Sequence, residues 1–111
     1  MSKLVKFTNL NEPIPKKDWV KETREIAKNS EKVFLTQHAK ERMLERNVTI
    51  QQVHDVLRYG KIVEEPYLET YGCWRTALEY LSAGKRIRVA VSFIEEGLLV
   101  ITVVDKGRGQ S

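Results

Sequence analysis

The stretch RIRVAVSFIEEGLLVITVV, residues 86–104, decides the fold of this chain. In its first half every second residue from position 87 is apolar, and this period of two indicates a strand with one buried face. The triplet EEG at 95–97 predicts a tight turn. Residues 98–104 are nearly all apolar, which indicates a central strand covered on both faces. The stretch therefore predicts two neighbouring antiparallel strands.

Two further strands are predicted before this pair. Lys61–Leu68 alternates weakly and contains Pro66, which favours an edge strand because proline cannot donate to a ladder. Residues 74–81 form the next candidate strand, and SAGK at 82–85 predicts the turn that follows it. Consecutive strands joined by short turns predict an antiparallel meander.

Before Gly60 the apolar residues recur with the period of a helix, and after Gly60 they follow the period of a strand. Thr36 and Thr49 are suited to cap helices, and Gly60 is suited to end one. The apolar triplet VFL at 33–35 precedes Thr36, where a hydrophobic staple is common. The predicted helices span residues 16–30, Gln37–Arg46 and Ile50–Tyr59.

These elements predict an α+β fold, in which helices cover one face of a three- to four-stranded antiparallel sheet. The first helix has a thin apolar stripe, so residues 1–32 are expected to form an N-terminal extension with a helix. The domain itself is expected to span residues 33–105, and residues 106–111 to form a polar tail.

Composition limits the class of protein. The chain has 111 residues, 41% of them hydrophobic and 31% charged, which is typical of one soluble globular domain. The net charge is +4 and the isoelectric point about 9.3. Residues 1–60 carry the whole excess, with 12 Lys/Arg against 8 Asp/Glu. This mildly basic balance is compatible with a nucleic-acid partner.

The single cysteine, Cys73, excludes an intrachain disulfide, and a reducing cytoplasm is the simplest setting for such a chain. No apolar run approaches the ~18 residues of a membrane span. Residues 1–8 lack the apolar core of a signal peptide. We therefore expect a cytoplasmic protein with no membrane partner.

The helix predicted over Gln37–Arg46 carries His38, Arg42 and Arg46, which we call the basic strip. Residues four apart lie on one helix face, so a titratable group and two permanent cations are neighbours. Such a strip can bind a phosphate and move a proton, because the positive end of the helix favours a neutral His38 that can act as a base. The alternative is a solvated face in which Arg42 pairs with a neighbouring glutamate, since surface ion pairs are common on helices.

A second cationic group comprises the strand arginines, Arg86 and Arg88. Arginine binds phosphate bidentately and stays charged when partly buried, so the pair can cradle a phosphate. The alternative is pairing with glutamates across the strands. Aromatic rings nearby can stack on bases or occupy half-buried strand positions. The candidate RNA-contacting residues are Tyr67, Tyr71, Arg75, Tyr80 and Lys85.

The basic strip and the strand arginines are both expected at the boundary between helix and sheet. We therefore predict that His38, Arg42 and at least one strand arginine converge on one concave surface. The two histidines, His38 and His54, lie 16 residues apart, and with a lone cysteine they match no zinc spacing. No metal and no cofactor is expected.

The segment around the basic strip resembles a known family. The pattern T-x-H-A-x-x-R-M-x-x-R at 36–46 is followed by VT at 48–49, VL at 56–57 and Gly60. This pattern is similar to the hallmark of the prokaryotic domain-of-unknown-function family 4258. The resemblance covers about residues 33–105 and leaves the first helix outside.

The resemblance implies a relation to RelE-like and barnase-like small ribonucleases, many of them toxins of toxin–antitoxin pairs. It implies a compact RelE-like arrangement of helices on an antiparallel sheet and RNA cleavage without metal. The partners that it implies are RNA or the ribosome, and a small antitoxin protein.

The leading hypothesis is a metal-independent RNA-cleaving or RNA-binding protein of a toxin–antitoxin-type system. His38 would serve as base or acid, and the arginines of both groups would stabilise the phosphorane. The alternative is a non-catalytic module that binds a protein or nucleic acid on the same surface, with the basic strip structural. The residues in reserve as acids or stacking partners are Tyr67, Tyr71 and Tyr80.

Overall fold

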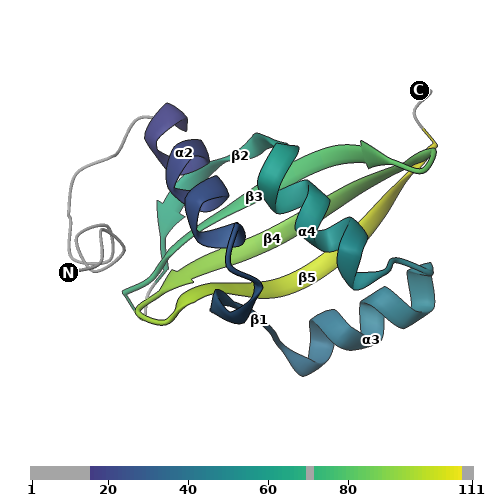
Figure 1. Ribbon diagram of the computed structural model, residues 1–111, viewed down its shortest axis with the longest axis horizontal. Coiled ribbons are helices and arrows are strands. Elements are labelled where there is room, and N and C mark those ends of the chain that lie inside the picture. The colour runs from purple at the N-terminus through teal and green to yellow at the C-terminus, as the bar shows by residue number, and fades with distance from the viewer. Residues whose placement is uncertain (1–15, 70–71, 109–111) are drawn as a thin grey trace.

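The computed structural model describes residues 16–69 and 72–108. The helices are α2 (Lys16–Ala27), α3 (Gln37–Arg46) and α4 (Ile50–Tyr59), with a short 3-10 helix, η1 (Ser30–Lys32). The strands are β1 (Val33–Leu35), β2 (Lys61–Leu68), β3 (Trp74–Ser82), β4 (Lys85–Ile94) and β5 (Gly97–Arg108). They form one sheet in the order β1-β5-β4-β3-β2. In Figure 1, α2 and α4 lie across one face of this sheet, and α3 lies beside β5.

The strands from β2 to β5 form the predicted antiparallel meander, and the fold is α+β as expected. The turn between β3 and β4 consists of Ala83 and Gly84, with φ angles of 52° and 81°. Two successive positive φ angles are the mark of a type I′ turn, whose twist matches that of the paired strands. β2 is an edge strand, as its proline predicted. β5 continues to Arg108, so the polar tail begins later than expected.

β1 makes the sheet five-stranded and mixed, so the prediction of three or four strictly antiparallel strands is wrong. Residues 33–35 pair in parallel with β5, with Phe34 opposite Leu99. Gly97 allows this approach, because a Cβ added there would clash with the Lys32 carbonyl. A three-residue strand is too short for a period of two to distinguish it from a helix lead-in.

The predicted helix termini of α3 and α4 are confirmed. Thr36 Oγ1 accepts a hydrogen bond from the Ala39 amide at 3.0 Å, and Asn47 ends α3 with a φ of 55°. Thr49 forms a capping box with Gln52, in which each side chain accepts from the other residue's backbone N–H. These local hydrogen bonds explain why the sequence located α3 and α4 to the residue.

The helix α2 belongs to the same core as the sheet, which differs from the expected extension. Trp19 is 0% exposed. Its ring lies 5.4 Å from that of Trp74 and 4.6 Å from that of Phe93, measured between centroids. Arg24 also donates to the Gly60 carbonyl at 3.3 Å. One tryptophan thus gives a helix with few apolar residues a large buried contact.

Candidate functional site

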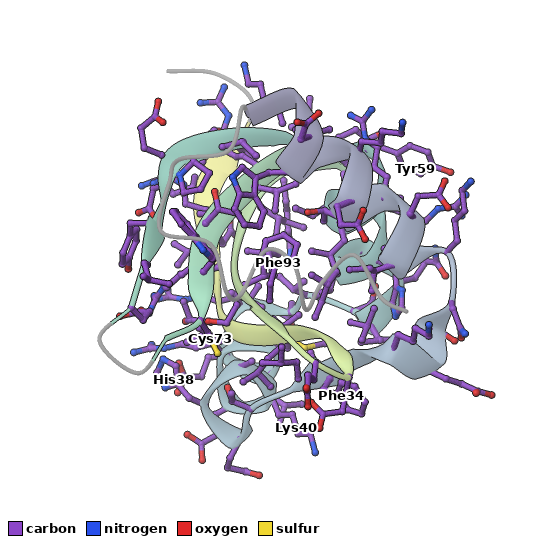
Figure 2. All side chains as sticks on the ribbon, turned by 90° about the vertical axis from the view of Figure 1, so that its left-hand side faces the viewer. Phe34, His38, Lys40, Tyr59, Cys73 and Phe93 are labelled. Atoms are coloured by element: carbon purple, nitrogen blue, oxygen red, sulfur yellow. The ribbon has the colours of Figure 1, made fainter. Side chains whose placement is uncertain are left out.

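The basic strip runs along α3 from its first turn to its last. Thr36 caps the helix, so His38 lies in the turn with free backbone N–H groups. The His38 side chain is exposed and makes no hydrogen bond or ion pair within the part of the chain that the structure describes. Figure 2 shows His38 at the surface, on the opposite side of the view from Tyr59. The imidazole is therefore accessible to a ligand from solvent.

The two arginines of the basic strip have different surroundings. Arg42 Nη1 lies 2.9 Å from Glu45 Oε1, and the two side chains are 39% and 58% exposed. An exposed pair of this kind contributes only about 0–1 kcal/mol, so a phosphate can replace the carboxylate. Arg46 is exposed in the last turn. Both cations remain accessible to an anion.

Lys85 fixes the C-terminal end of α3. Its Nζ donates to the Arg46 carbonyl at 3.0 Å and to the Asn47 carbonyl at 2.8 Å. A cation at this point also interacts favourably with the negative end of the helix. Lys85 was predicted to contact RNA, and in the structure its ammonium already binds the protein.

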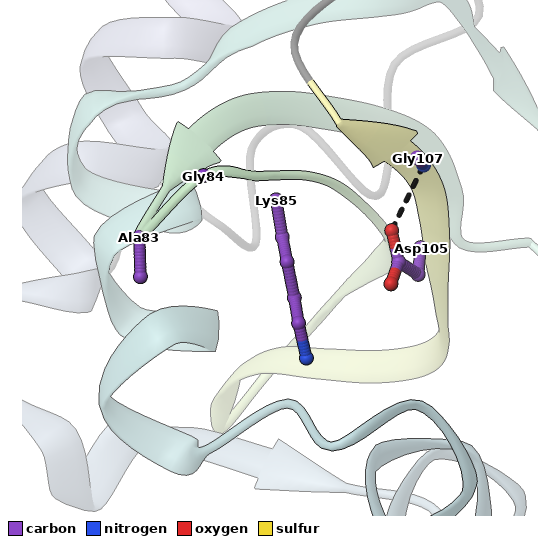
Figure 3. Close-up of a pocket in the computed structure, with 5 residues that line it drawn as sticks. All are labelled: Ala83, Gly84, Lys85, Asp105 and Gly107. Carbon is purple, nitrogen blue, oxygen red and sulfur yellow. Dashed lines mark hydrogen bonds between the residues drawn. The ribbon is translucent and has the colours of Figure 1, made fainter.

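A small cavity of about 320 Å³ lies beside Lys85. Figure 3 shows its lining, with a hydrogen bond from the Gly107 amide to Asp105 Oδ1. This cavity lies between the β3–β4 turn and the end of β5. The lining residues are Ala83, Gly84, Lys85, Asp105 and Gly107.

The strand arginines lie on β4, on the face opposite α2 and α4. Ile87 and Val89 belong to the core under those helices, so alternation directs Arg86 and Arg88 to the other face. Arg88 Nε and Nη2 each lie 3.1 Å from Glu79 Oε2 on β3. This cross-strand pairing matches the structural alternative that the sequence left open for Arg88.

A second polar cluster surrounds Arg75 on β3. Arg75 Nη1 lies 3.1 Å from Glu69 Oε2, and the Tyr67 hydroxyl donates to the same oxygen at 3.5 Å. Desolvation raises the pKa of the Tyr67 phenol above its ordinary value, and Glu69 adds to the increase while Arg75 opposes it. The Tyr67 hydroxyl therefore stays protonated at neutral pH and can donate.

The remaining aromatic candidates are Tyr80 and Tyr71. Tyr80 is half-buried, and its ring centroid lies 5.9 Å from that of Tyr59 on α4. This contact makes Tyr80 a packing residue between sheet and helix. Tyr71 lies outside the described residues.

The basic strip and the strand arginines have different neighbours in the structure. α3 packs along β5, with Arg42 bound to Glu45 in the same helix. Arg88 is bound to Glu79, on the side of β4 away from β5. Convergence of His38 and Arg42 with a strand arginine on one surface stays a prediction.

Sequence reasoning missed Lys61. It is the Cα partner of Glu79, which in turn is the partner of Arg88. Lys61 follows Gly60 at the start of β2, and only the register of β2 against β3 places it beside the strand arginines. Bulges in that ladder make the register unreadable from the sequence.

Within residues 16–69 and 72–108, no three His, Cys, Asp or Glu side chains are grouped so that they could hold a metal ion. Over the same residues, no helix has the length and apolar character to cross a membrane.

Comparison with known protein families finds a match over most of the chain. The family described as "Domain of unknown function (DUF4258)" matches residues 35–105, from the end of β1 to a point near the end of β5. The matched range contains α3, α4 and the meander and leaves α2 outside. No curated protein and no solved structure matches the chain significantly.

Proposed function

Because the chain belongs to the DUF4258 family, whose description assigns no activity, we propose a function from its own residues: it binds RNA and cleaves it without metal. It would act as a RelE-like toxin of a toxin–antitoxin-type system. The observation that supports this proposal is the accessible imidazole of His38, with Arg42 and Arg46 on the following turns of α3.

The proposed reaction uses the RNA's own 2′-hydroxyl. His38 accepts the proton from this hydroxyl, whose oxygen attacks the adjacent phosphorus. The bond from phosphorus to the 5′ oxygen breaks, and that oxygen takes a proton from solvent. The products are a 2′,3′-cyclic phosphate and a 5′-hydroxyl.

The arginines of the basic strip supply the charge stabilisation. The phosphorane carries more negative charge on its non-bridging oxygens than the ground-state diester does, and guanidinium groups bind such oxygens bidentately. Arg42 would exchange its exposed bond to Glu45 for one to the phosphate. This exchange costs little, since the existing pair is solvated.

Cleavage of a defined single-stranded RNA in EDTA tests the role of His38. His38→Ala should lower the cleavage rate by about 10²-fold, the usual scale for a lost general base. The chain has two histidines, so His54→Gln is the matched control and should retain activity. Equal rates for wild type and His38→Ala, with melting temperatures unchanged, would show that His38 is not the base.

A second candidate function is a binding module without turnover, and the sheet face favours it. Arg88 and Arg75 are both bound to glutamates that are less exposed than the arginines. Partly buried pairs are screened less by solvent than the Arg42 pair, so Arg75 and Arg88 resist exchange of their glutamates for phosphorane oxygens, which favours binding without cleavage. Binding of RNA or of a small antitoxin protein with no cleavage in any buffer would select this function.

A further inference from the structure

A row of polar side chains crosses three strands on the face of the sheet opposite α2 and α4 (Figure 1). Tyr67 on β2 is the Cα partner of Arg75 on β3, and Arg75 is the partner of Ser92 on β4. Residues directly opposite each other in an antiparallel ladder project to one face. Glu69 joins the row through its bonds to Arg75 and Tyr67. We propose that these four residues, the Arg75 cluster, recognise a guanine base of single-stranded RNA.

The Arg75 cluster has hydrogen-bonding groups that the protein itself does not use. Within residues 16–69 and 72–108, Arg75 makes one hydrogen bond, through Nη1, although a guanidinium carries five N–H donors. Its Nε and the Ser92 hydroxyl are buried without a hydrogen-bond partner in that part of the chain. Glu69 binds both of its neighbours through Oε2, which leaves Oε1 able to accept. Buried donors without an acceptor are rare and costly, so they point to a ligand that supplies the acceptor.

The charge of the Arg75 cluster favours a base over a phosphate. Arg75 and Glu69 form an ion pair of 3.1 Å that is neutral overall, with side chains 26% and 19% exposed. A neutral ligand that offers acceptors to a guanidinium and donors to a carboxylate suits such a pair. Guanine does so, because O6 and N7 accept from the fork of an arginine and its N–H groups can donate to a carboxylate. Adenine carries an amino group in place of O6, and this donor opposes the N–H groups of Arg75.

Tyr67 supplies the surface on which the base can stack. It is 44% exposed and lies on the edge strand β2. Its hydroxyl donates to Glu69 Oε2 at 3.5 Å, which places the ring beside the ion pair. Proteins recognise unpaired RNA bases by combining an aromatic ring with hydrogen bonds to the edge of the base. The partner that fits is therefore a single strand.

This inference adds a base preference to the proposed function, and it rests on that function only for RNA as the ligand. Its residues differ from the basic strip, so a base can bind here with or without cleavage at α3. The test measures binding to 2′-O-methyl RNA, which cannot be cut through its 2′ oxygen. Fluorescence anisotropy compares a labelled oligouridine containing one guanosine with the same strand containing one adenosine or one 7-deazaguanosine.

Wild-type protein should bind the guanosine strand at least about tenfold more tightly than the adenosine strand, the scale of one bidentate contact to a base. The 7-deazaguanosine strand should lose most of this preference, because a carbon replaces N7. In amide NMR spectra, the guanosine strand should shift the signals of Tyr67, Arg75 and Ser92 more than the adenosine strand does.

Arg75→Lys keeps the charge and loses the planar fork, so it should bind the guanosine and adenosine strands equally. Arg88→Lys is the matched control. Arg88 is also paired with a glutamate on this face, but it uses both Nε and Nη2 in that pair. This variant should keep the wild-type preference for guanosine, and so should His38→Ala, which changes the residue proposed as the base in cleavage.

Equal affinity of wild-type protein for the guanosine and adenosine strands, an undiminished preference for 7-deazaguanosine, or full preference in folded Arg75→Lys would overturn the proposal. Binding of 5′-GMP as tight as that of the guanosine strand would also overturn it, because the ligand would then be a free nucleotide. The wild-type comparisons decide the matter even if a variant fails to fold. A guanosine preference without any cleavage would support this inference and contradict only the function proposed for α3.

Discussion

At the scale of single residues, Thr36 connects the candidate site to the sheet. Its hydroxyl accepts from the Ala39 amide and donates to the Ile101 carbonyl, each at 3.0 Å. Its own amide donates to the Val100 carbonyl at 3.1 Å. The first turn of α3, which carries His38, is thereby held against β5.

Thr36→Val tests this connection, because valine keeps the shape and loses both hydroxyl hydrogen bonds. It should lower the free energy of unfolding by about 2 kcal/mol, the upper range for a lost helix cap. Thr49→Val removes only a cap of α4 and should cost about 1 kcal/mol. Urea unfolding measures both, and equal losses would mean that the bond to β5 contributes nothing.

Residue types and spacing predicted which side chains share one face of α3, but not the contacts that depend on strand register or tertiary packing. His38, Arg42 and Arg46 follow from four-residue spacing on a helix whose caps are local. The partner of Arg88 depends on strand register, and the sequence alone left several glutamates as candidates. Lys61 depends on register as well, and the ammonium of Lys85 reaches α3 only through the packing of a turn against a helix.

At the scale of elements, the helices α2, α3 and α4 and the meander could be read from the sequence, whereas β1 and the packing of α2 into the core could not. Helix caps and strict apolar–polar alternation depend on residues that are close together in the chain, so a single sequence is enough to recognise them. β1 has three residues, and its parallel partner lies more than sixty residues away. α2 shows a thin apolar stripe because the residues that it buries beside Trp19 include the polar Thr23 and the small Ala27.

Trp19→Ala measures how far α2 belongs to the domain. Loss of a fully buried tryptophan should lower the free energy of unfolding by about 3–5 kcal/mol. Lys21→Ala changes an exposed residue of the same helix and should stay within about 0.5 kcal/mol of wild type. A small effect of Trp19→Ala in a thermal or urea melt would show that α2 is an extension that contributes little to the core.

At the scale of the whole molecule, cations lie both on α3 and on the face of the sheet opposite α2 and α4. If RNA contacts three or four of these cations, log K for binding should fall with log salt at a slope of about −2 to −3. Arg42→Gln should reduce the magnitude of that slope by about 0.7. Fluorescence anisotropy with a labelled single strand at several salt concentrations measures it, and a flat response would indicate a protein partner.

The central claim is that the chain cleaves RNA through the 2′-hydroxyl, and the ends of the fragments test it most directly. Mass spectrometry of a defined RNA incubated with wild-type protein in EDTA should find 2′,3′-cyclic phosphate and 5′-hydroxyl ends. A single 2′-deoxy nucleotide should abolish the cut that follows it. Intact RNA, fragments with 5′-phosphate ends, or a cut that persists after the 2′-deoxy position would contradict the account.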